Sequence, residues 1–403
     1  MIRIQDASAI IKGEKPVDSL GVKALDDKTF QVTLEQPVPY FIKMLAHPTT
    51  FPVPQKVVEK YGDDWTKPEN MVSNGAYKME RWVVNERIKL VRNSHYWNDA
   101  KTVIDEVSFL PISGNVELTR YKAGEVDFTN GTNPIPVQHF ASLKKSIPDE
   151  VKITPRLSTY YYEFNEQVKP FDDARVRKAL SYAINRDAIA KHVMKQGQTP
   201  AYTLTPTSVA GFIPPEIDYS KMTQTERNAE AKRLLAEAGF GPDNPLKFDL
   251  LYNTDESHKQ IAIAVSQMWK PLGVKVTLEN QEWKTFLDSK SEGKFQVARA
   301  GWAGDYNEAS TFLDLKTSTH GNNDGNFNSP EYDALMKKSR TVTSDKERTE
   351  LYRKAEKILA EEMPLAPVIE YKTSRLVKSY VGGYPMGNVE DNIYTKDLYI
   401  EKH

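Results

Sequence analysis

The feature that most constrains the fold of this chain is an alternation of strand-like and helix-like segments between residues 246 and 300. Two segments with helical character, 261–269 and 283–287, separate three apolar runs at 246–252, 274–278 and 295–300. Such alternation is typical of β-α-β units, in which helices pack against a sheet. We therefore predict an α/β lobe in this region.

An amphipathic helix is expected after Asp172 and Asp173, either of which can cap its first turn. Its apolar stripe is formed by residues 176, 179, 180, 183 and 184, and Arg177 and Arg186 lie largely off this stripe. Beyond it, the sequence predicts helices at 225–238 and 346–360, a strand at 364–371 and an extended tail at 393–402.

The first third of the chain is expected to be mostly sheet. Phe30, Val32 and Leu34 alternate with polar residues, which predicts a strand with one buried face. A second strand system follows residues 74–77 and ends at Asn93, and its apolar positions again alternate with polar ones.

Length and composition limit the number of lobes and the kinds of partner. The 403 residues exceed what one hydrophobic core usually supports, so two or three lobes are expected. Lys and Arg (54) nearly balance Asp and Glu (55), which argues against nucleic acid or an anionic membrane surface as a partner. The absence of cysteine excludes disulfides and Cys-ligated metals. No apolar run approaches the roughly 20 residues that span a bilayer.

Signatures of catalysis are absent from the sequence. The seven histidines never fall at the i, i+4 spacing that places two imidazoles on one helical face for a metal, and no cofactor is predicted. There is no Gly-x-Ser-x-Gly elbow and no Gly-x-x-x-x-Gly-Lys-Ser/Thr loop. We predict that the chain is not an enzyme. A hydrolase with a glycosidase-like carboxylate pair is the alternative, since acidic neighbours occur at 26–27, 63–64 and 361–362.

Several segments resemble the extracytoplasmic solute-binding proteins of the peptide and nickel class, family 5. Short matches lie at 74–77 (NGAY), 93–97 (NSHYW) and 120–127 (RYKAGEVD). Three longer segments are similar to the oligopeptide-binding members of this class and to their murein-peptide-binding paralogues: 158–186, 278–288 and 295–314, the last reading FQVARAGWAGDYNEASTFLD. Their order and spacing extend the resemblance over essentially all of the chain.

The resemblance implies a periplasmic binding protein-like α/β fold of type II, cluster C, with two main lobes joined by a hinge and part of a third, accessory lobe. The expected division is 1–55 for a remnant of the accessory lobe, 56–157 with 373–403 for the first binding lobe, and 158–372 for the second. Family members begin with an export signal and further residues ahead of the position that matches Met1, so we expect an N-terminally truncated chain.

The resemblance also implies a function. Members of the class capture oligopeptides in a cleft between lobes and deliver them to the membrane permease subunits of a peptide ABC transporter. We therefore expect a monomeric periplasmic peptide-binding protein without a cofactor, either free or anchored as a lipoprotein. A specific preference for murein peptides is the alternative within the family.

Residues for the charged ends of a peptide follow from the same resemblance. Asp305 matches the aspartate that anchors the ligand α-ammonium, and its other interpretation is a turn aspartate. Arg299, His258 and Lys290 match cations that meet the ligand carboxylate at different distances. An internal ion pair is the alternative for Arg299, and a surface position is the alternative for the other two.

Aromatic residues complete the predicted site. Trp283 and Trp302 match tryptophans that line ligand pockets, and Tyr161 and Tyr371 match tyrosines whose hydroxyls can bond a peptide backbone. Gly301, next to Trp302, belongs to the same predicted set. The alternative for Tyr161 is a position in an aromatic core.

Overall fold

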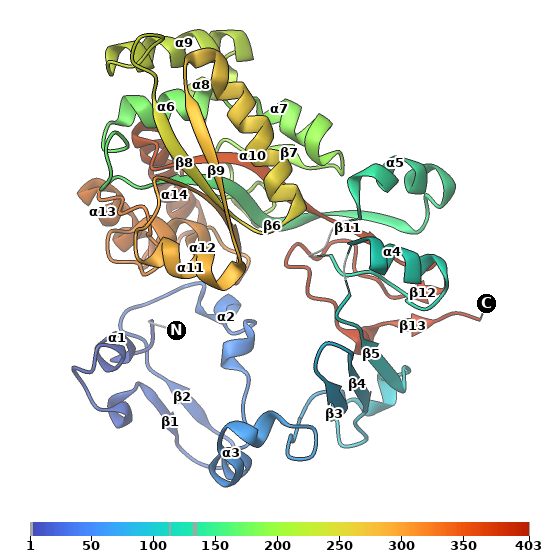
Figure 1. Cartoon of the computed structure of the whole chain (residues 1–403). Coiled ribbons are helices and arrows are strands. Elements are labelled where there is room, and N and C mark those ends of the chain that lie inside the picture. Colours follow the sequence, from blue (N-terminus) through green and yellow to red (C-terminus); the bar gives the residue numbers. More distant parts are fainter. Residues whose placement is uncertain (1–2, 113, 132–134, 403) are drawn as a thin grey trace. The chain divides into compact units, whose positions relative to one another are not determined.

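The computed structural model describes residues 3–112, 114–131 and 135–402, and Figure 1 shows its helices and strands. The chain divides into two compact units. Residues 1–46 group with unit 1, and the division does not separate a third lobe. The accessory lobe expected for residues 1–55 therefore stays a prediction. Unit 1 comprises Met1–Ala46, Ser158–Arg186 and Pro200–Ile369, and unit 2 comprises His47–Leu157, Asp187–Thr199 and Glu370–His403.

A six-stranded sheet with the order β7-β11-β6-β10-β8-β9 is the centre of unit 1. Strand β10 is antiparallel to β6 and parallel to β8, and β8 is parallel to β9. The four strands predicted after residue 245 are confirmed, and so is the α/β fold. The chain passes from one unit to the other after residues 46, 157, 186, 199 and 369, and two of these points lie within β6 and within β11. The strands are Val151–Phe164 (β6), Thr199–Pro200 (β7), Lys247–Asn253 (β8), Lys275–Gln281 (β9), Val297–Ala303 (β10) and Leu365–Leu376 (β11).

Helices α10 (Glu256–Trp269) and α11 (Trp283–Ser291) cover opposite faces of this sheet. Because neighbouring side chains along a strand point to opposite faces, one strand can contact both helices. Phe248 on β8 packs edge-on against the tryptophan that ends α10, with 5.5 Å between ring centroids. Leu251 lies three positions further along β8, so its side chain points to the other face, where it belongs to a core cluster with Phe286 of α11. Both helices confirm segments predicted from the sequence.

Helix α6 (Ala174–Tyr182) begins at Asp173, whose carboxylate accepts a hydrogen bond from a backbone N–H of the first turn. This is one of the two predicted caps. Arg177 and Arg186, expected largely off the apolar stripe, are both buried. Each guanidinium donates to backbone carbonyls of neighbouring segments, so its N–H donors find partners inside the protein.

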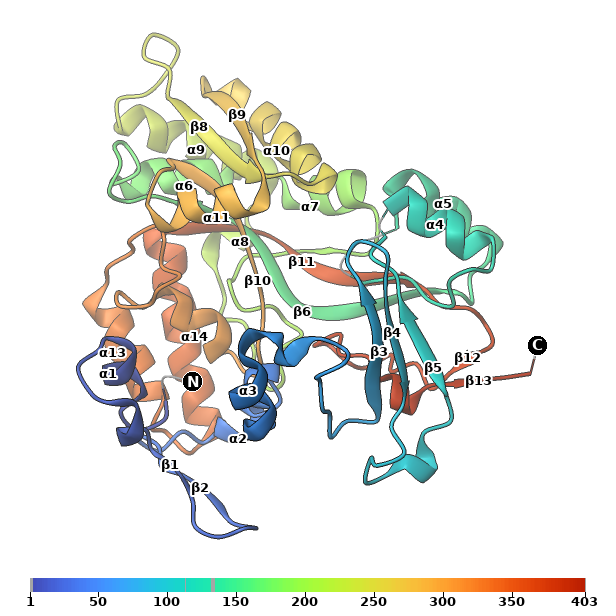
Figure 2. The same cartoon turned by 60° about the horizontal axis from the view of Figure 1, so that its bottom comes forward.

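The remaining helices of unit 1 pack around these elements. Thr223 and Glu226 form a reciprocal cap at the start of α9. Helix α13 lies beside α14, which is the longest helix among the described residues (Figure 2). No helix in the described ranges is both long and apolar enough to cross a membrane. The bounds are Asp218–Lys221 (α8), Gln224–Glu237 (α9), Ser310–Leu313 (α12), Pro330–Ser339 (α13) and Asp345–Glu362 (α14). Helix α7 (Arg186–Ala188) begins at the last residue of a segment of unit 1 and continues into unit 2.

The first residues of unit 1 form a small cluster of their own. Strands β1 (Val22–Ala24) and β2 (Phe30–Val32) pair as an antiparallel hairpin, which confirms the predicted strand. Its predicted buried face is wrong at Phe30, whose side chain is 67% exposed, because no described element covers the end of the hairpin. Tyr40 belongs to the buried apolar cluster of this region, and its ring stacks on Tyr306. Two short helices flank the hairpin, Ala7–Ile11 (α1) and Phe41–Met44 (α2).

Unit 2 contains a three-stranded antiparallel sheet, which confirms the second predicted strand system. None of its described strand residues is buried. The apolar clusters of this unit instead lie around α4 and α5 and around the chain that follows β11. The elements are Gln55–Tyr61 (α3), Tyr77–Val83 (β3), Arg87–Arg92 (β4), Glu106–Phe109 (β5), Gly114–Lys122 (α4), Val137–Ser146 (α5), Val381–Gly382 (β12) and Tyr399–Ile400 (β13).

Candidate functional site

The candidate residues of unit 1 gather mainly at the carboxyl ends of parallel strands. Strand β8 ends at Asn253 and β10 at Ala303, and parallel strands bring these ends to the same edge of the sheet. His258 lies in the first turn of α10, and Asp305 follows β10 by two residues. The carboxyl edge of parallel strands is the usual position of ligand sites in α/β proteins.

One face of β10 carries a cation stacked on an aromatic ring. The guanidinium carbon of Arg299 lies 5.1 Å from the centroid of the Tyr160 ring, and the ring of His258 lies 5.5 Å from the same centroid. Arg299 also contacts Asn253, with 3.4 Å between Nη1 and Oδ1. The face of an aromatic ring attracts a cation, so Tyr160 helps to orient the guanidinium.

His258 is held in its neutral form. Burial, and then the neighbouring positive charge of Arg299, lower the pKa of His258 to about 2. Its Nδ1 lies 3.7 Å from an oxygen of Asp255, too far for a hydrogen bond, and has no such partner among the described residues. Burial beside Arg299 therefore favours the neutral imidazole, whereas the resemblance implies a cation at this position.

Gly301 gives the Arg299 side chain its space. It pairs with Tyr160 in the register of β10 and β6. A Cβ at this position would lie 3.0 Å from Nη2 of Arg299 and 3.4 Å from the carbonyl oxygen of Thr159. Any larger residue would therefore press on the guanidinium.

The opposite face of β10 carries Trp302, because neighbouring positions along a strand point to opposite faces. Its indole N–H donates to the hydroxyl of Thr311 at 3.3 Å. The same hydroxyl accepts from the backbone N–H of Asp305 at 3.0 Å. Thr311 thus joins two of the predicted ligand residues through one oxygen atom.

A cavity of about 400 Å³ in unit 1 is lined by Asp305, Trp302 and Thr311. Its wall also contains two arginines, Arg3 and Arg340, which both pair with the carboxylate of Asp314. Asp305 is exposed and is one of the residues that line this polar cavity.

Lys290 lies in a buried network of charges. Its ammonium is 2.9 Å from Glu163 and 3.0 Å from Asp324, and Lys316 forms a further ion pair with Glu163. Burial would lower the pKa of Lys290, but Glu163 and its neighbours raise it above the usual value. Burial would likewise raise the pKa of Glu163, but the two lysines lower it to about 2. Glu163 and Asp324 together therefore balance the charges of Lys290 and Lys316.

The three remaining aromatic candidates lie in different surroundings. Tyr161 is buried on β6, and burial together with Glu163 raises its pKa. Trp283 begins α11, is 50% exposed and stacks on Phe286. Tyr371 lies on β11 and belongs to unit 2, whereas the other eight candidates belong to unit 1.

Sequence reasoning missed several residues that hold this site. Tyr160, Asn253 and Thr311 support Arg299, Trp302 and Asp305 but are common residue types in strands and helix starts. Of the missed residues, Glu163 could have been found from the sequence. It lies within the run of aromatic residues from 160 to 164, and a carboxylate in such a buried strand requires a positively charged partner.

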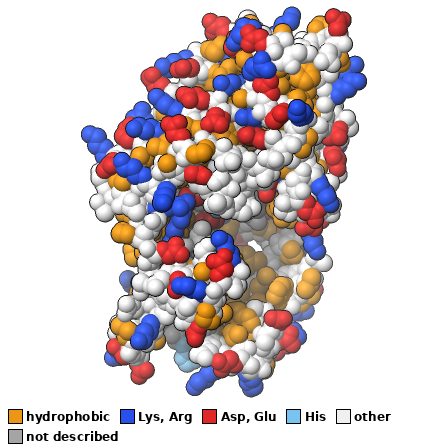
Figure 3. Space-filling model, turned by 90° about the vertical axis from the view of Figure 1, so that its left-hand side faces the viewer, with side chains coloured by type: hydrophobic (Ala, Val, Ile, Leu, Met, Phe, Trp, Pro, Cys, Tyr) orange, Lys and Arg blue, Asp and Glu red, His pale blue; other side chains and the backbone are white. Residues whose placement is uncertain are grey.

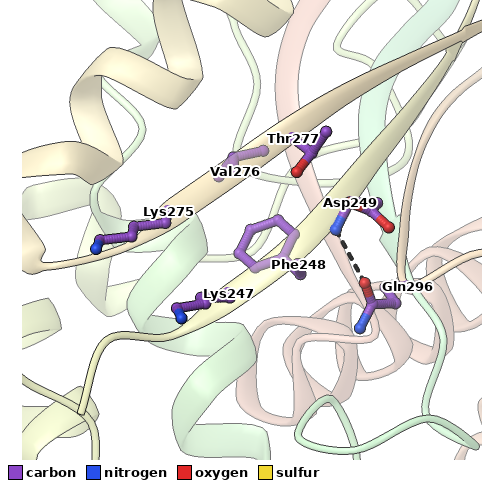
Figure 4. Close-up of a pocket in the computed structure, with 7 residues that line it drawn as sticks. All are labelled: Lys247, Phe248, Asp249, Lys275, Val276, Thr277 and Gln296. Atoms are coloured by element: carbon purple, nitrogen blue, oxygen red, sulfur yellow. Dashed lines mark hydrogen bonds between the residues drawn. The ribbon is translucent and has the colours of Figure 1, made fainter.

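A second cavity, of about 340 Å³, lies at the opposite ends of the strands (Figure 4). It is formed by the first residues of β8 and β9, where Lys247 pairs with Lys275, and by Gln296 ahead of β10. The side-chain oxygen of Gln296 accepts a hydrogen bond from the backbone of Asp249. Ligand sites rarely use the amino ends of parallel strands, so this cavity is not the candidate site.

The surface and the distribution of ligating groups agree with the balanced composition. Figure 3 shows Lys and Arg side chains interspersed with Asp and Glu over the face that it displays. Within the described part of the chain, no group of three or more His, Asp or Glu side chains is arranged to hold a metal ion. Recognition by a large field of one sign is therefore not supported.

Comparison with known proteins gives a family and a relative. Residues 4–324 match the sequence profile of the bacterial extracellular solute-binding proteins, family 5 Middle. The chain is 54% identical over 402 residues to the periplasmic oligopeptide-binding protein OppA of Salmonella typhimurium. This alignment covers 99% of the present chain and 74% of that protein.

Two solved structures share the fold. The Escherichia coli murein tripeptide binding protein MppA has a TM-score of 0.92 and 47% identity, over 100% of this chain and 79% of that one. Haemophilus influenzae OppA, in complex with the peptide RPPGFSPFR, has a TM-score of 0.89 and 45% identity, with the same two coverages. These similarities confirm the predicted type II binding-protein fold.

Proposed function

The chain belongs to the bacterial extracellular solute-binding proteins of family 5, and from this premise we propose that it captures short oligopeptides and delivers them to an ABC-type peptide importer. Similarity along the whole chain to an oligopeptide-binding protein carries the proposal. The protein acts in the periplasm, as a monomer, and releases its ligand unchanged to the permease subunits. Asp305 and Arg299 provide the charged groups that bind the two ends of the peptide.

The ammonium end of the peptide binds Asp305. All peptides share a backbone and two charged ends, so a binder that accepts many sequences takes its affinity from these groups. Asp305 is exposed, borders a polar cavity and lies at the carboxyl edge of the sheet. A carboxylate in this position forms charge-assisted hydrogen bonds to an α-ammonium, which are about twice as strong as neutral ones.

The carboxylate end of the peptide binds Arg299. A guanidinium keeps its charge in proteins, and stacking on Tyr160 fixes its orientation. His258 contributes a neutral ring that can donate a hydrogen bond, and Lys290 acts mainly through its ion pairs with Glu163 and Asp324. Replacing Arg299 by Ala should therefore weaken short peptides more than replacing His258 by Ala.

The aromatic candidates provide space for varied side chains. Trp302 and Trp283 offer ring surface to the ligand, and Gly301 keeps room for the guanidinium beside it. Tyr161 shapes the site from within the core, and Tyr371 offers a hydroxyl to the peptide backbone. This set of residues selects peptides by their ends more than by their sequence.

Native mass spectrometry of the purified chain tests the proposal. We expect masses of co-purified peptides that are lost after unfolding and refolding, and calorimetric binding of added tripeptides to the refolded chain. Turnover of a substrate by a chain that binds no peptide would refute the proposal and favour an enzyme.

A murein peptide is the second candidate ligand, because the similarity to a murein tripeptide binding protein extends over the whole chain. Competition decides between the two. A general peptide binder takes trialanine and the murein tripeptide with affinities of the same order, whereas a specialised one binds the murein tripeptide far more tightly.

A further inference from the structure

The turn that follows β10 carries Asp305 beyond the support of the sheet. The last pair between β10 and β6 joins Ala303 to Ser158. Thr311, on the short helix α12, is 5% exposed, and its hydroxyl oxygen accepts from the backbone N–H of Asp305 and from the indole N–H of Trp302. One buried residue therefore links the strand end to the turn.

The far side of this turn is fixed independently. The Tyr306 hydroxyl lies 2.9 Å from the hydroxyl of Ser310, and the Tyr306 ring stacks on Tyr40. Glu308 accepts from the backbone N–H of Ser310 and pairs with Arg348. These contacts hold the turn after Asp305, whereas Thr311 contacts Asp305 itself.

We infer that Thr311 is a positioning residue for the ligand ammonium, acting through the hydrogen bond that its hydroxyl accepts from the backbone N–H of Asp305. The inference rests on the proposed role of Asp305 in peptide binding. A carboxylate that is already in place loses little freedom when the ligand arrives, which preserves affinity. Without the hydroxyl, two N–H donors lose an acceptor and the turn relaxes to find another.

Replacing Thr311 by Val tests this role with little change in side-chain shape. We expect the dissociation constant of a free-amine tripeptide to rise about tenfold, the usual effect of losing a hydrogen bond in a site. The dissociation constant of the N-acetylated peptide should change less than about twofold, since it has no ammonium to place. Thr311→Ser keeps the hydroxyl and should bind both peptides like the parent.

Thr203→Val is the matched control. Thr203 is buried, its hydroxyl donates to a backbone carbonyl at 2.8 Å, and it does not line the candidate cavity. It should lower the thermal midpoint without changing the ratio between free-amine and acetylated affinities. Thr311→Ala gives the same comparison if the valine variant does not fold.

A double-mutant cycle with Asp305→Asn separates positioning from general stability. If Thr311 acts through the Asp305 carboxylate, Thr311→Val should cost no further affinity in a chain that already carries Asp305→Asn. Additive losses, or equal losses for both peptides, would overturn the inference while leaving peptide binding intact. A parent chain that binds neither peptide would instead refute the proposed function, and with it this role of Thr311.

Discussion

The six-stranded sheet of unit 1 and the three-stranded sheet of unit 2 differ in how they are packed. In β8 the burial pattern leaves only two of seven residues exposed, and α10 and α11 cover its two faces. In β3, β4 and β5 no described strand residue is buried. The same contrast holds for charges, since Lys290 bridges two carboxylates inside unit 1 and Lys89 bridges two on the surface of unit 2.

This difference shows where the site obtains its rigidity. Arg299, Gly301 and Trp302 lie on a strand that is paired on both sides, and Tyr160 on the neighbouring strand is fully buried. A binding residue on such a strand keeps its geometry without help from the ligand. The sheet of unit 2 cannot provide this, because its side chains retain contact with water.

Replacing a buried tryptophan should have the largest effect. Trp269 is 0% exposed, packs on Tyr162 and Phe248, and donates its indole N–H to the carbonyl of Leu180. Trp269→Ala should lower the free energy of unfolding by about 3 to 5 kcal/mol, measured by urea denaturation of the whole chain. Trp82→Ala, at a 49% exposed position of β3, should cost less than about 1 kcal/mol. Equal losses would show that the two sheets do not differ in packing.

Removing one charge from the buried network should have the next effect. Glu163→Gln removes the carboxylate that pairs with Lys316 and leaves Lys290 with Asp324 alone. We expect a loss of about 3 kcal/mol at neutral pH, because a buried charge without its partner is costly. Glu106→Gln removes a carboxylate from the exposed Lys89 bridge and should cause no measurable change. A stable Glu163→Gln variant would contradict the assignment of these ion pairs to a water-free core.

Acid should then act on the same network. The pKa of Glu163 lies at about 2 in the folded chain, below its ordinary value of 4.5. Its contribution to stability is therefore complete above pH 4.5 and is lost as the pH falls toward 2. The difference in unfolding free energy between the parent and Glu163→Gln should shrink over this range. A difference that stays constant with pH would show that Glu163 does not titrate with this shift.

Much of unit 1 could be predicted because its signals are local. Apolar runs and helical stripes between residues 172 and 300 record which face of each element is buried, and the observed strands and helices match them. Phe30 shows the limit of such patterns. Its alternation predicts a strand correctly, but burial depends on an element that packs above it, and none is described there.

The candidate site was less predictable because its electrostatics depend on residues far apart in the sequence. The resemblance identified Lys290 as a ligand cation, yet its partners Glu163 and Asp324 come from two distant segments. The neutral state of His258 similarly follows from burial and from the charge of Arg299 on another element. No local pattern carries this information.

Calorimetry with one peptide in two forms tests the central claim most directly. The parent chain and Asp305→Asn are titrated with a tripeptide that has a free amine and with its N-acetylated form. We predict that Asp305→Asn weakens the free-amine peptide by about 2 to 4 kcal/mol, because an ammonium loses its charged partner, and leaves the acetylated peptide almost unchanged. Equal losses for both peptides, or no loss for either, would contradict the account.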